Sequence, residues 1–523
     1  MSARPRFVPA GVGPLALLLA AGCSSDAHER RAELSARRLL AERSQQHLGA
    51  REREALRPRE LAPEPQVPDL VTQPRLVLDL RAALRTAFDS SRGMQAQREA
   101  LEADALSLAS VRHSFAPQLA LSLGYALAER PGAGDANTGT ASFDVSQILP
   151  SGAQLSLSAA SASAALEGDS PAHDSLLSAR LAQPLLRGAG HAVTHEPLIQ
   201  AERSLVYSLR EFELFREDFS IDTARRYYDL VNRKQAIDNQ RRNLESNEFG
   251  RRQAEALFAV GRANELDVLR ARRSELQAKN ALLEAEEGLE LALDGFRIFL
   301  GLPPEQPIDV EPQAPPFTPV RYELESALAV ARANRLDLLN RREQLEDVER
   351  GVRLAADTLR PDLDLVLETS YATDDSADLL GADLGRTNTS LALTLGIPLD
   401  RVRERNAYRT AKLGLARARR DLAEFEDQLR VSIQSSFREL ARRMQSLEIQ
   451  HQLIEDQTKN LRIAELRFER GEIPNRDVVE ANQALLDAEN ARIDEQVAYE
   501  IARLQLLRDL GILFIDDTGM WKE

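Results

Sequence analysis

The chain has 523 residues, of which 28% are charged and only 5% aromatic, and this mixture indicates long helices. Acidic residues outnumber basic ones by 82 to 67, which gives a formal net charge of −15 and argues against nucleic acid as a partner. A single cysteine excludes a disulfide framework, and the lack of any run of 18 apolar residues excludes a membrane-spanning helix.

Residues 1–22 are predicted to be an export signal, because two arginines precede an apolar stretch and small residues follow it. The peptide Leu-Ala-Ala-Gly-Cys that ends at Cys23 resembles a bacterial lipobox, in which the cysteine is lipidated. It departs from the usual pattern, since Ala20 stands where leucine is common. Ser24 follows in place of aspartate, which by resemblance to enteric lipoproteins indicates the outer membrane. An ordinary signal peptide with an unmodified cysteine is the alternative.

An internal repeat organises the rest of the chain. Residues 80–121 align with residues 324–365 at an offset of 244, and 11 of these 42 positions are identical. A second match has an offset of 210, and it relates the motif Phe-x-x-Gly-x5-Asp-Val that begins at Phe258 to the one that begins at Phe468. The offsets differ by 34. The first copy is therefore expected to hold about 34 extra residues between its first strand and this motif.

Each copy is predicted to contain a helix, a strand pair, a very long helix, a turn and a returning helix. The extra residues hold two further candidate strands, about 141–147 and 153–159. The predicted parts are the signal 1–22, a lipid-anchored segment with a proline-rich linker 23–76, a first repeat 77–302, a proline-rich linker 303–320, a second repeat 321–515 and a tail 516–523. Their expected elements are helices 77–115 and 321–359, strands within 118–184 and 362–399, long helices 195–257 and 403–467, and returning helices 265–299 and 475–510.

The predicted strands alternate between apolar and polar side chains. Residues expected to face lipid are Leu119, Leu121, Leu123, Tyr125, Leu363, Leu365, Leu367, Leu391, Leu393 and Leu395. An apolar outer face and a polar inner face are typical of a transmembrane barrel wall, and a half-buried soluble sheet is the alternative. Four to six strands cannot enclose a watery lumen, and open strand edges are not tolerated in lipid. Several chains are therefore expected to share one barrel.

The lipobox, the two copies, the strand pairs and the repeated motif together resemble the TolC-like outer-membrane efflux proteins, over residues 77–515. The resemblance implies a mainly α protein with a transmembrane β portion, in which duplicated long antiparallel helices form a periplasmic α-barrel. It implies a homotrimer whose twelve-stranded barrel crosses the outer membrane. The 34-residue insertion departs from the implied four strands per chain. Its hairpin could join the wall, extend the outer loops or fold inward.

The function that the resemblance implies is a passive exit channel of a tripartite efflux or type I secretion system. The implied partners are a periplasmic adaptor, an inner-membrane transporter and outer-membrane lipid, with an anchor at Cys23. No cofactor, metal or catalytic residue is expected, because the sequence holds no phosphate-binding loop or nucleophile motif, and His191 and His195 lack metalloprotease spacing. A periplasmic coiled-coil scaffold lipoprotein without channel activity is the competing function.

The turns after the long helices are the candidate sites. By resemblance they form the periplasmic tip where an adaptor docks, through Gly261, Arg262, Asn264, Gly471, Glu472, Pro474 and Asn475. Helix capping alone would also explain their glycines and proline. By the same resemblance, Asp477 and Glu480, with Asp267 at the equivalent place in the first copy, line an acidic periplasmic gate. Threefold symmetry would turn these carboxylates into rings that attract cations, whereas the plainer alternative is stabilisation of a helix N-terminus.

Overall fold

The computed structural model describes residues 25–47, 75–130, 134–166, 172–313, 315, 317–320, 323–374, 387–470 and 472–522. The predicted signal, Cys23 and Gly471 lie outside these residues. Contacts divide the chain into two units. The first comprises Met1–His47, Leu101–Leu209 and Arg341–Leu422, and the second comprises Leu48–Ala100, Arg210–Asn340 and Ala423–Glu523. Among the described helices, none combines the length and the apolar character that a membrane span requires.

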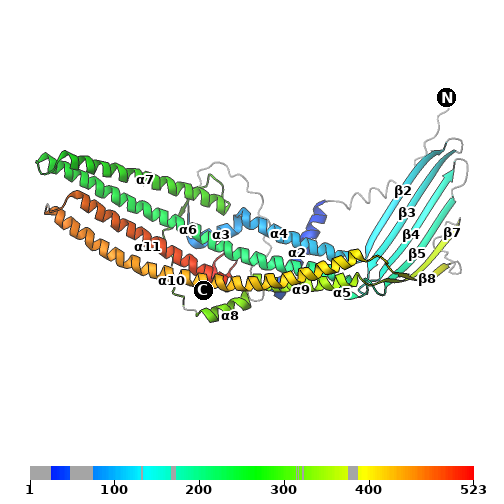
Figure 1. Ribbon diagram of the computed structural model, residues 1–523. Coiled ribbons are helices and arrows are strands. Elements are labelled where there is room, and N and C mark those ends of the chain that lie inside the picture. Colours follow the sequence, from blue (N-terminus) through cyan, green and yellow to red (C-terminus); the bar gives the residue numbers. More distant parts are fainter. Residues whose placement is uncertain are drawn as a thin grey trace, which may run out of the picture. The chain divides into compact units, whose positions relative to one another are not determined.

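The first unit contains a six-stranded antiparallel sheet in the order β2-β3-β4-β5-β7-β8 (Figure 1). Its strands are β2 (Gln118–Arg130), β3 (Gly134–Ile148), β4 (Gln154–Leu166), β5 (Ala172–Pro184), β7 (Asp362–Asp374) and β8 (Thr387–Gly396). Both candidate strands of the insertion are present, as β3 and β4, and they lie inside the sheet between β2 and β5. The chain therefore supplies six strands where the resemblance implied four.

Helices accompany this sheet in the first unit. They are α2 (Ser25–His47), α5 (His191–Thr194) and those parts of α4 (Arg92–Ser114), α6 (Glu196–Ala259), α9 (Leu336–Asp357) and α10 (Val402–Glu469) that fall within the unit. Helix α2 packs through buried Ala36 and Leu39, and Arg43 lies 2.6 Å from Glu202 of α6. The helices α6 and α10 begin and end within two residues of the predicted long helices.

The second unit is built from two long helical hairpins. The first joins α6 to α7 (Glu265–Leu300), and the second joins α10 to α11 (Asn475–Asp509). Side-chain pairs set the order of these helices as α7-α6-α11-α10, because Arg251 of α6 pairs with Glu275 of α7, Asn239 of α6 bonds Asn490 of α11, and Arg443 of α10 pairs with Glu495 of α11. Helices α7 and α10 are thus the two outer members of this layer (Figure 1).

The prediction of one continuous helix at the start of each repeat is wrong. Helix α3 (Leu80–Ser90) is separated from α4 by Ser91, and α8 (Leu324–Asn334) is separated from α9 by Arg335, both in extended conformation. The reason lies in the returning helices. Gly301 after α7 and Gly511 after α11 both have positive φ, 76° and 68°, and a Cβ on either would collide with the backbone where the short helix ends. Ser91 and Arg335 are 244 residues apart, and Gly301 and Gly511 are 210 residues apart, which are the two offsets of the internal repeat.

Short strands complete the second unit. Strand β1 (Leu76–Leu78) pairs in parallel with β6 (Ile308–Val310), which lies within the segment predicted as a proline-rich linker. The predicted tail contains β10 (Trp521–Lys522), which pairs with β9 (Phe514–Ile515). This hairpin packs on α6, because Arg216 donates to the carbonyl oxygen of Ile515 and Ser220 donates to that of Gly519.

Candidate functional site

The sheet of the first unit separates apolar from polar side chains. Register places Leu119, Val145, Leu157 and Ala179 opposite one another across β2 to β5, and the same face continues through Leu367 to Leu391. All ten residues predicted to face lipid lie on this one face. Most are strongly exposed, as Leu121 at 57% and Leu391 at 69% illustrate. A large apolar surface that the chain itself leaves uncovered marks a membrane or protein contact.

The opposite face of the sheet is lined by small and polar side chains. Serine, alanine, threonine and glycine dominate it, and a hollow of about 500 Å³ lies over Ser122, Thr140 and Asp174. Charged groups on this face include Arg180, which lies 3.9 Å from Glu368 on the neighbouring strand. Small polar side chains leave room for water beside the sheet. The sequence predicted this polar face correctly.

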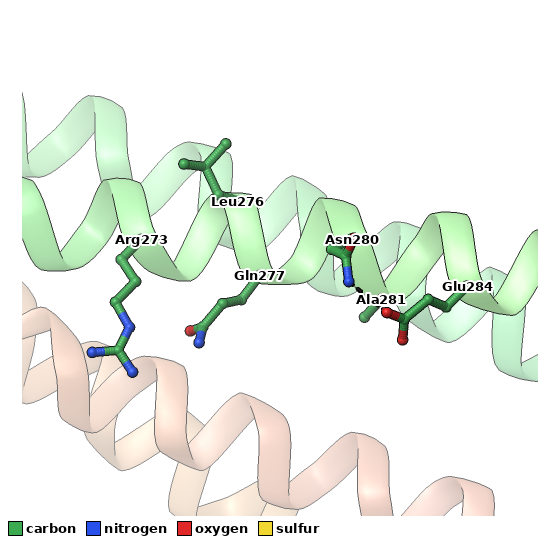
Figure 2. A pocket seen from close by; sticks show the side chains of 6 residues that line it. All are labelled: Arg273, Leu276, Gln277, Asn280, Ala281 and Glu284. Carbon is green, nitrogen blue, oxygen red and sulfur yellow. Dashed lines mark hydrogen bonds between the residues drawn. The ribbon is translucent and has the colours of Figure 1, made fainter.

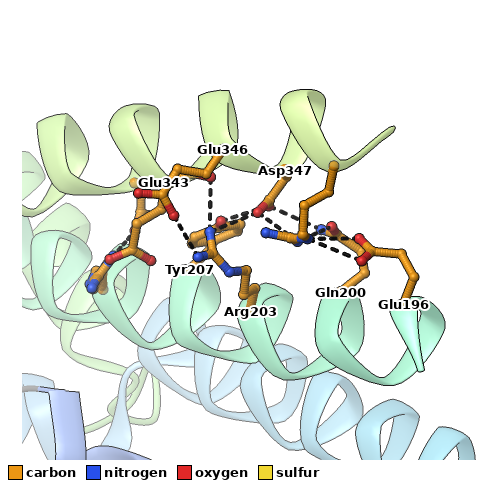
Figure 3. Close-up of polar contacts among 10 residues, drawn as sticks. Glu196, Gln200, Arg203, Tyr207, Glu343, Glu346 and Asp347 are labelled. Carbon is orange, nitrogen blue, oxygen red and sulfur yellow. Dashed lines mark hydrogen bonds and ion pairs between the residues drawn. The ribbon is translucent and has the colours of Figure 1, made fainter. Parts of the chain in front are cut away.

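A cluster of ionic contacts fixes α6 against α9 in the first unit (Figure 3). Arg203 of α6 lies 2.8 Å from Asp347 and 2.6 Å from Glu346 of α9, and Tyr207 donates to Asp347 at 2.6 Å. Burial, together with the hydrogen bond to Asp347, raises the pKa of Tyr207 well above its usual range. One turn away, Arg350 spans Glu196 and Asp347 at 2.9 and 2.8 Å. Sequence reasoning missed this cluster, since the helical spacing of its members does not reveal which helix they meet.

The first tip turn is held by a reciprocal helix cap. The Asn264 side chain accepts from the Asp267 backbone N–H at 2.9 Å, and the Asp267 carboxylate accepts from the Asn264 N–H at 3.3 Å. Gly261 adopts φ 73°, which suits glycine after a helix end. Arg270 also lies 3.8 Å from Asp267. In this chain Asp267 therefore serves its own helix start.

The second tip turn has no side-chain cap. Pro474 is the N-cap residue of α11, and Asn475 is the first residue of the helix. Arg476 lies 3.5 Å from Asp477 and 3.4 Å from Glu480, the two proposed gate residues. Arg476 is adjacent to Asp477 in the sequence and four residues before Glu480, so only its contact with Glu480 follows helical spacing. It compensates part of the acidic charge that the gate prediction assigned to this turn.

The two tips lie close together in the second unit. A cavity of about 600 Å³ is lined by both, with Arg262 and Asp267 from the first turn and Phe468, Pro474 and Glu480 from the second. Glu472 lies at the contact limit of 4.0 Å from Arg470. The structure thus brings four of the predicted tip and gate residues, Arg262, Asp267, Pro474 and Glu480, around one hollow.

Helix α7 carries an exposed apolar stripe along its length. Its members recur at spacings of seven or eight residues and are Leu269, Leu276, Leu283, Leu291 and Ile298. Figure 2 shows that Leu276 points away from the second helical hairpin, whereas Arg273 and Gln277 of the same helix point toward it. All three line a hollow of about 480 Å³. Helix α10 likewise exposes Val431, Met444, Ile449, Ile463 and Leu466. Both outer helices of the layer therefore present apolar side chains to the outside.

His191 and His195 stack on each other with ring centroids 4.1 Å apart, and Phe115 stacks on His195. Burial, with the charge of His191, lowers the pKa of His195. Within the described part of the chain, no group of three histidine, cysteine or acidic residues is arranged to hold a metal ion.

Residues 327–511 match the model of a family described as outer membrane efflux protein. The chain therefore contains an outer membrane efflux protein domain. No curated protein matches the chain. The efflux protein domain covers α8 to α11 with β7 and β8, and it includes the second tip turn but not the first.

Solved structures extend the likeness over most of the chain. The fold is similar to the outer membrane protein VceC from Vibrio cholerae, at 16% identity and a TM-score of 0.62, covering 83% of this chain and 96% of VceC. It is also similar to the Campylobacter jejuni CmeC outer membrane channel (16%, 0.61, covering 83% and 85%) and to the open state of the Neisseria gonorrhoeae MtrE outer membrane channel (13%, 0.59, covering 83% and 89%). The efflux protein domain thus belongs to a chain with the fold of outer-membrane channels.

Proposed function

We propose that this chain is the exit channel of a tripartite efflux or type I secretion system in the outer membrane. Three copies would close into one passive conduit, which a periplasmic adaptor joins to an inner-membrane transporter. The observation that carries the proposal is the six-stranded sheet, with exposed leucines on one face and small polar side chains on the other. Such a wall suits lipid on one side and water on the other.

The free edges of the sheet support association with further copies. Strand β2 pairs only with β3, and β8 pairs only with β7, so each has an open edge among the described residues. The six strands alternate in direction, so β8 of one copy would meet β2 of the next in antiparallel pairing. An open edge in lipid leaves backbone groups without partners, at a cost of several kcal/mol per group. Closure through neighbouring copies removes both edges.

The helical layer supports the same association. Its outer members α7 and α10 expose apolar stripes, and Leu276 and Leu291 of α7 are 59% and 73% exposed. If copies meet side by side, the stripe on α7 of one copy lies against α10 of the next. Leu276→Glu should then reduce the assembled fraction. Gln277→Glu, on the neighbouring residue that points toward the second hairpin, is the matched control (Figure 2).

A planar-bilayer recording tests the conduit directly. Purified assembled protein should give steady conductance with a preference for cations, because the net charge is strongly negative and Asp174 lies on the polar face of the sheet. A folded assembly that gives no conductance would refute the proposal. Solubility without detergent after replacement of Cys23 would instead favour the periplasmic scaffold.

The second tip turn is proposed as the periplasmic gate. Three copies would gather Asp477 and Glu480 around the axis, with Arg476 beside each pair. Asp477→Ala with Glu480→Ala should raise conductance and weaken block by multivalent cations. Arg476→Gln, which removes only the compensating charge, should strengthen that block. Block that is unchanged in both variants would refute the acidic ring and leave the conduit intact.

The tip residues around the shared cavity are proposed to receive the adaptor. Arg262 and Pro474 line the hollow between the two turns, and Phe468 gives it an apolar wall. Glu472 belongs to the second turn and lies 4.0 Å from Arg470. Charge reversal at Arg262 should weaken adaptor binding in a pull-down with the purified adaptor while conductance persists. The lipid anchor at Cys23 is proposed from the sequence alone, and mass spectrometry of the mature N-terminus tests it.

A further inference from the structure

The hairpin formed by β3 and β4 is the part of the molecule that the resemblance does not account for. It comes from the 34-residue insertion of the first repeat, and nothing equivalent lies between β7 and β8 among the described residues. Its pairing is continuous, from Gln118–Ser146 to Arg130–Gly134 with β2 and from Gln154–Ala182 to Ala164–Ala172 with β5. An inward plug or an outer loop would not share such long ladders with both neighbours.

The hairpin also shares the two-faced character of the wall. Val145 and Phe143 of β3 and Leu157 of β4 lie on the apolar face, in line with Leu119 and Leu121 of β2. On the other face the hairpin presents mainly serine, alanine and threonine, together with the carboxylate of Asp144. Because side chains alternate along a strand, a shift of one residue would turn every leucine inward. The insertion is therefore built in phase with the sheet.

The turn between β3 and β4 is held by contacts with other parts of the first unit. The Ser151 hydroxyl lies 2.7 Å from Oε1 of Gln183, and Gly190 N–H donates to the Ser151 carbonyl at 2.9 Å. Gly152 has φ 93°, and a Cβ there would collide with the Gly188 carbonyl and with Thr194. These contacts fix the position of the turn beside the end of β5, which places β3 and β4 within the sheet.

We infer that the extra hairpin widens the outer-membrane conduit to eighteen strands, so that it passes solutes too bulky for a twelve-stranded wall. The inference rests on the proposed trimer. At a strand spacing of about 4.8 Å and a tilt near 40°, eighteen strands give a backbone diameter of about 36 Å and twelve give about 24 Å. Six strands occupy an arc of about 38 Å, close to the roughly 36 Å needed by four helices packed side by side.

The chain offers a clean excision. Strands β2 and β5 each have 13 residues, and they run in opposite directions. Replacing residues 131–171 with Asn-Gly joins them by a two-residue hairpin. Gln118 then lies opposite Pro184, and every apolar side chain keeps its face. A variant in which residues 167–171 become five glycines and serines keeps all six strands and serves as the control.

Labelling inside the wall measures its width. Ser122→Cys places a thiol on the polar face in all three proteins, and maleimide-polyethylene glycols of increasing mass are added from outside intact cells. Protein without this substitution reports labelling at Cys23. Small reagents should label all three equally, whereas the excised variant should react at least about tenfold more slowly with the larger reagents. An equal size limit in parent and excised variant would overturn the inference.

Two further measurements separate the possible failures. Native mass spectrometry of the parent should give three copies, and electron cryomicroscopy along the axis should show eighteen strands. Two copies, or twelve strands around the axis, would overturn the inference even if the excised variant does not assemble. A parent without conductance would refute the proposed conduit itself. A conducting parent with a narrow wall would refute only the widening.

Discussion

Among the described residues, four strands stand between the short helices and the long helix of the first repeat, whereas two stand there in the second repeat. The short helices before these strands correspond closely in the two repeats, since α8 begins and ends 244 residues after α3. The tips also differ, because Asn264 and Asp267 form a reciprocal cap and Pro474 does not. The two repeats are therefore alike where the end of a short helix packs against the end of a returning helix. They differ where the proposed assembly meets lipid, solute or a partner protein.

The largest effect is expected from charges on the apolar face of the sheet. Leu121→Arg in the first repeat and Leu393→Arg in the second should each cost about 2–4 kcal/mol per copy if both faces meet lipid. The measurement is the fraction of assembled protein in the outer-membrane fraction. Ser122→Arg, on the opposite face, is the control. Normal assembly of both leucine variants would show that the two repeats do not share a lipid-facing wall.

A smaller loss of stability is expected from a substitution in the cluster of ionic contacts between α6 and α9. Arg203→Met should lower the free energy of unfolding by about 2–3 kcal/mol, because Asp347 then loses a close charged partner in a partly buried place. The equivalent position in the second repeat is Leu413, so the repeats are not interchangeable here. Denaturant unfolding measures the effect.

The control for this cluster is Arg225→Met, which removes an exposed contact within α6. It should change the stability by less than about 0.5 kcal/mol. Equal effects of the two substitutions would mean that the cluster does not fix the helices.

The tips should differ by about 1 kcal/mol in their response to substitution. Asn264→Ala removes a side-chain cap and should cost about that much locally, whereas Pro474→Ala removes none. Hydrogen exchange in the first turn of α7 and of α11 measures the difference. Similar acceleration at both tips would contradict the assigned capping.

The smallest effect on stability is expected from the ion pair between Lys234 and Asp309, and this effect depends on pH. Desolvation raises the pKa of Asp309, but its bonds to Lys234 and the Val310 N–H outweigh this and lower it. A folded pKa below the unfolded value of about 3.9 stabilises the protein above that pH, and the gain is lost as the pH falls through the folded value. Lys234→Met should thus reduce stability at pH 6 by less than about 1 kcal/mol, and by a smaller amount at pH 3. Thermal unfolding at both pH values tests this.

Periodicity predicted the parts of the fold that depend on local pattern. The long helices, the strand phases and the exposed leucines follow from alternation and from helical spacing within one segment. The breaks at Ser91 and Arg335 did not follow, because they depend on glycines some 200 residues later in the sequence. The position of β3 and β4 within the sheet could not be predicted either, since these strands and their neighbours show the same alternation of apolar and polar residues.

At the tips, the sequence identified the turns but not the charge balance. Arg476 lies beside both Asp477 and Glu480, and only the side-chain directions at a helix start reveal that it meets both. The cluster around Arg203 was hidden for a different reason. Its partners lie about 140 residues away, and no pattern within either helix specifies the other.

Gly301 and Gly511 record the ancestry of the chain. Each fits where its backbone meets the end of a short helix so closely that any larger residue would collide. Tandem duplication of an ancestral gene would have produced both at once, and later drift has changed most positions around them. Steric exclusion explains why these two positions remain glycine in both repeats, beside the other identities that the repeats still share.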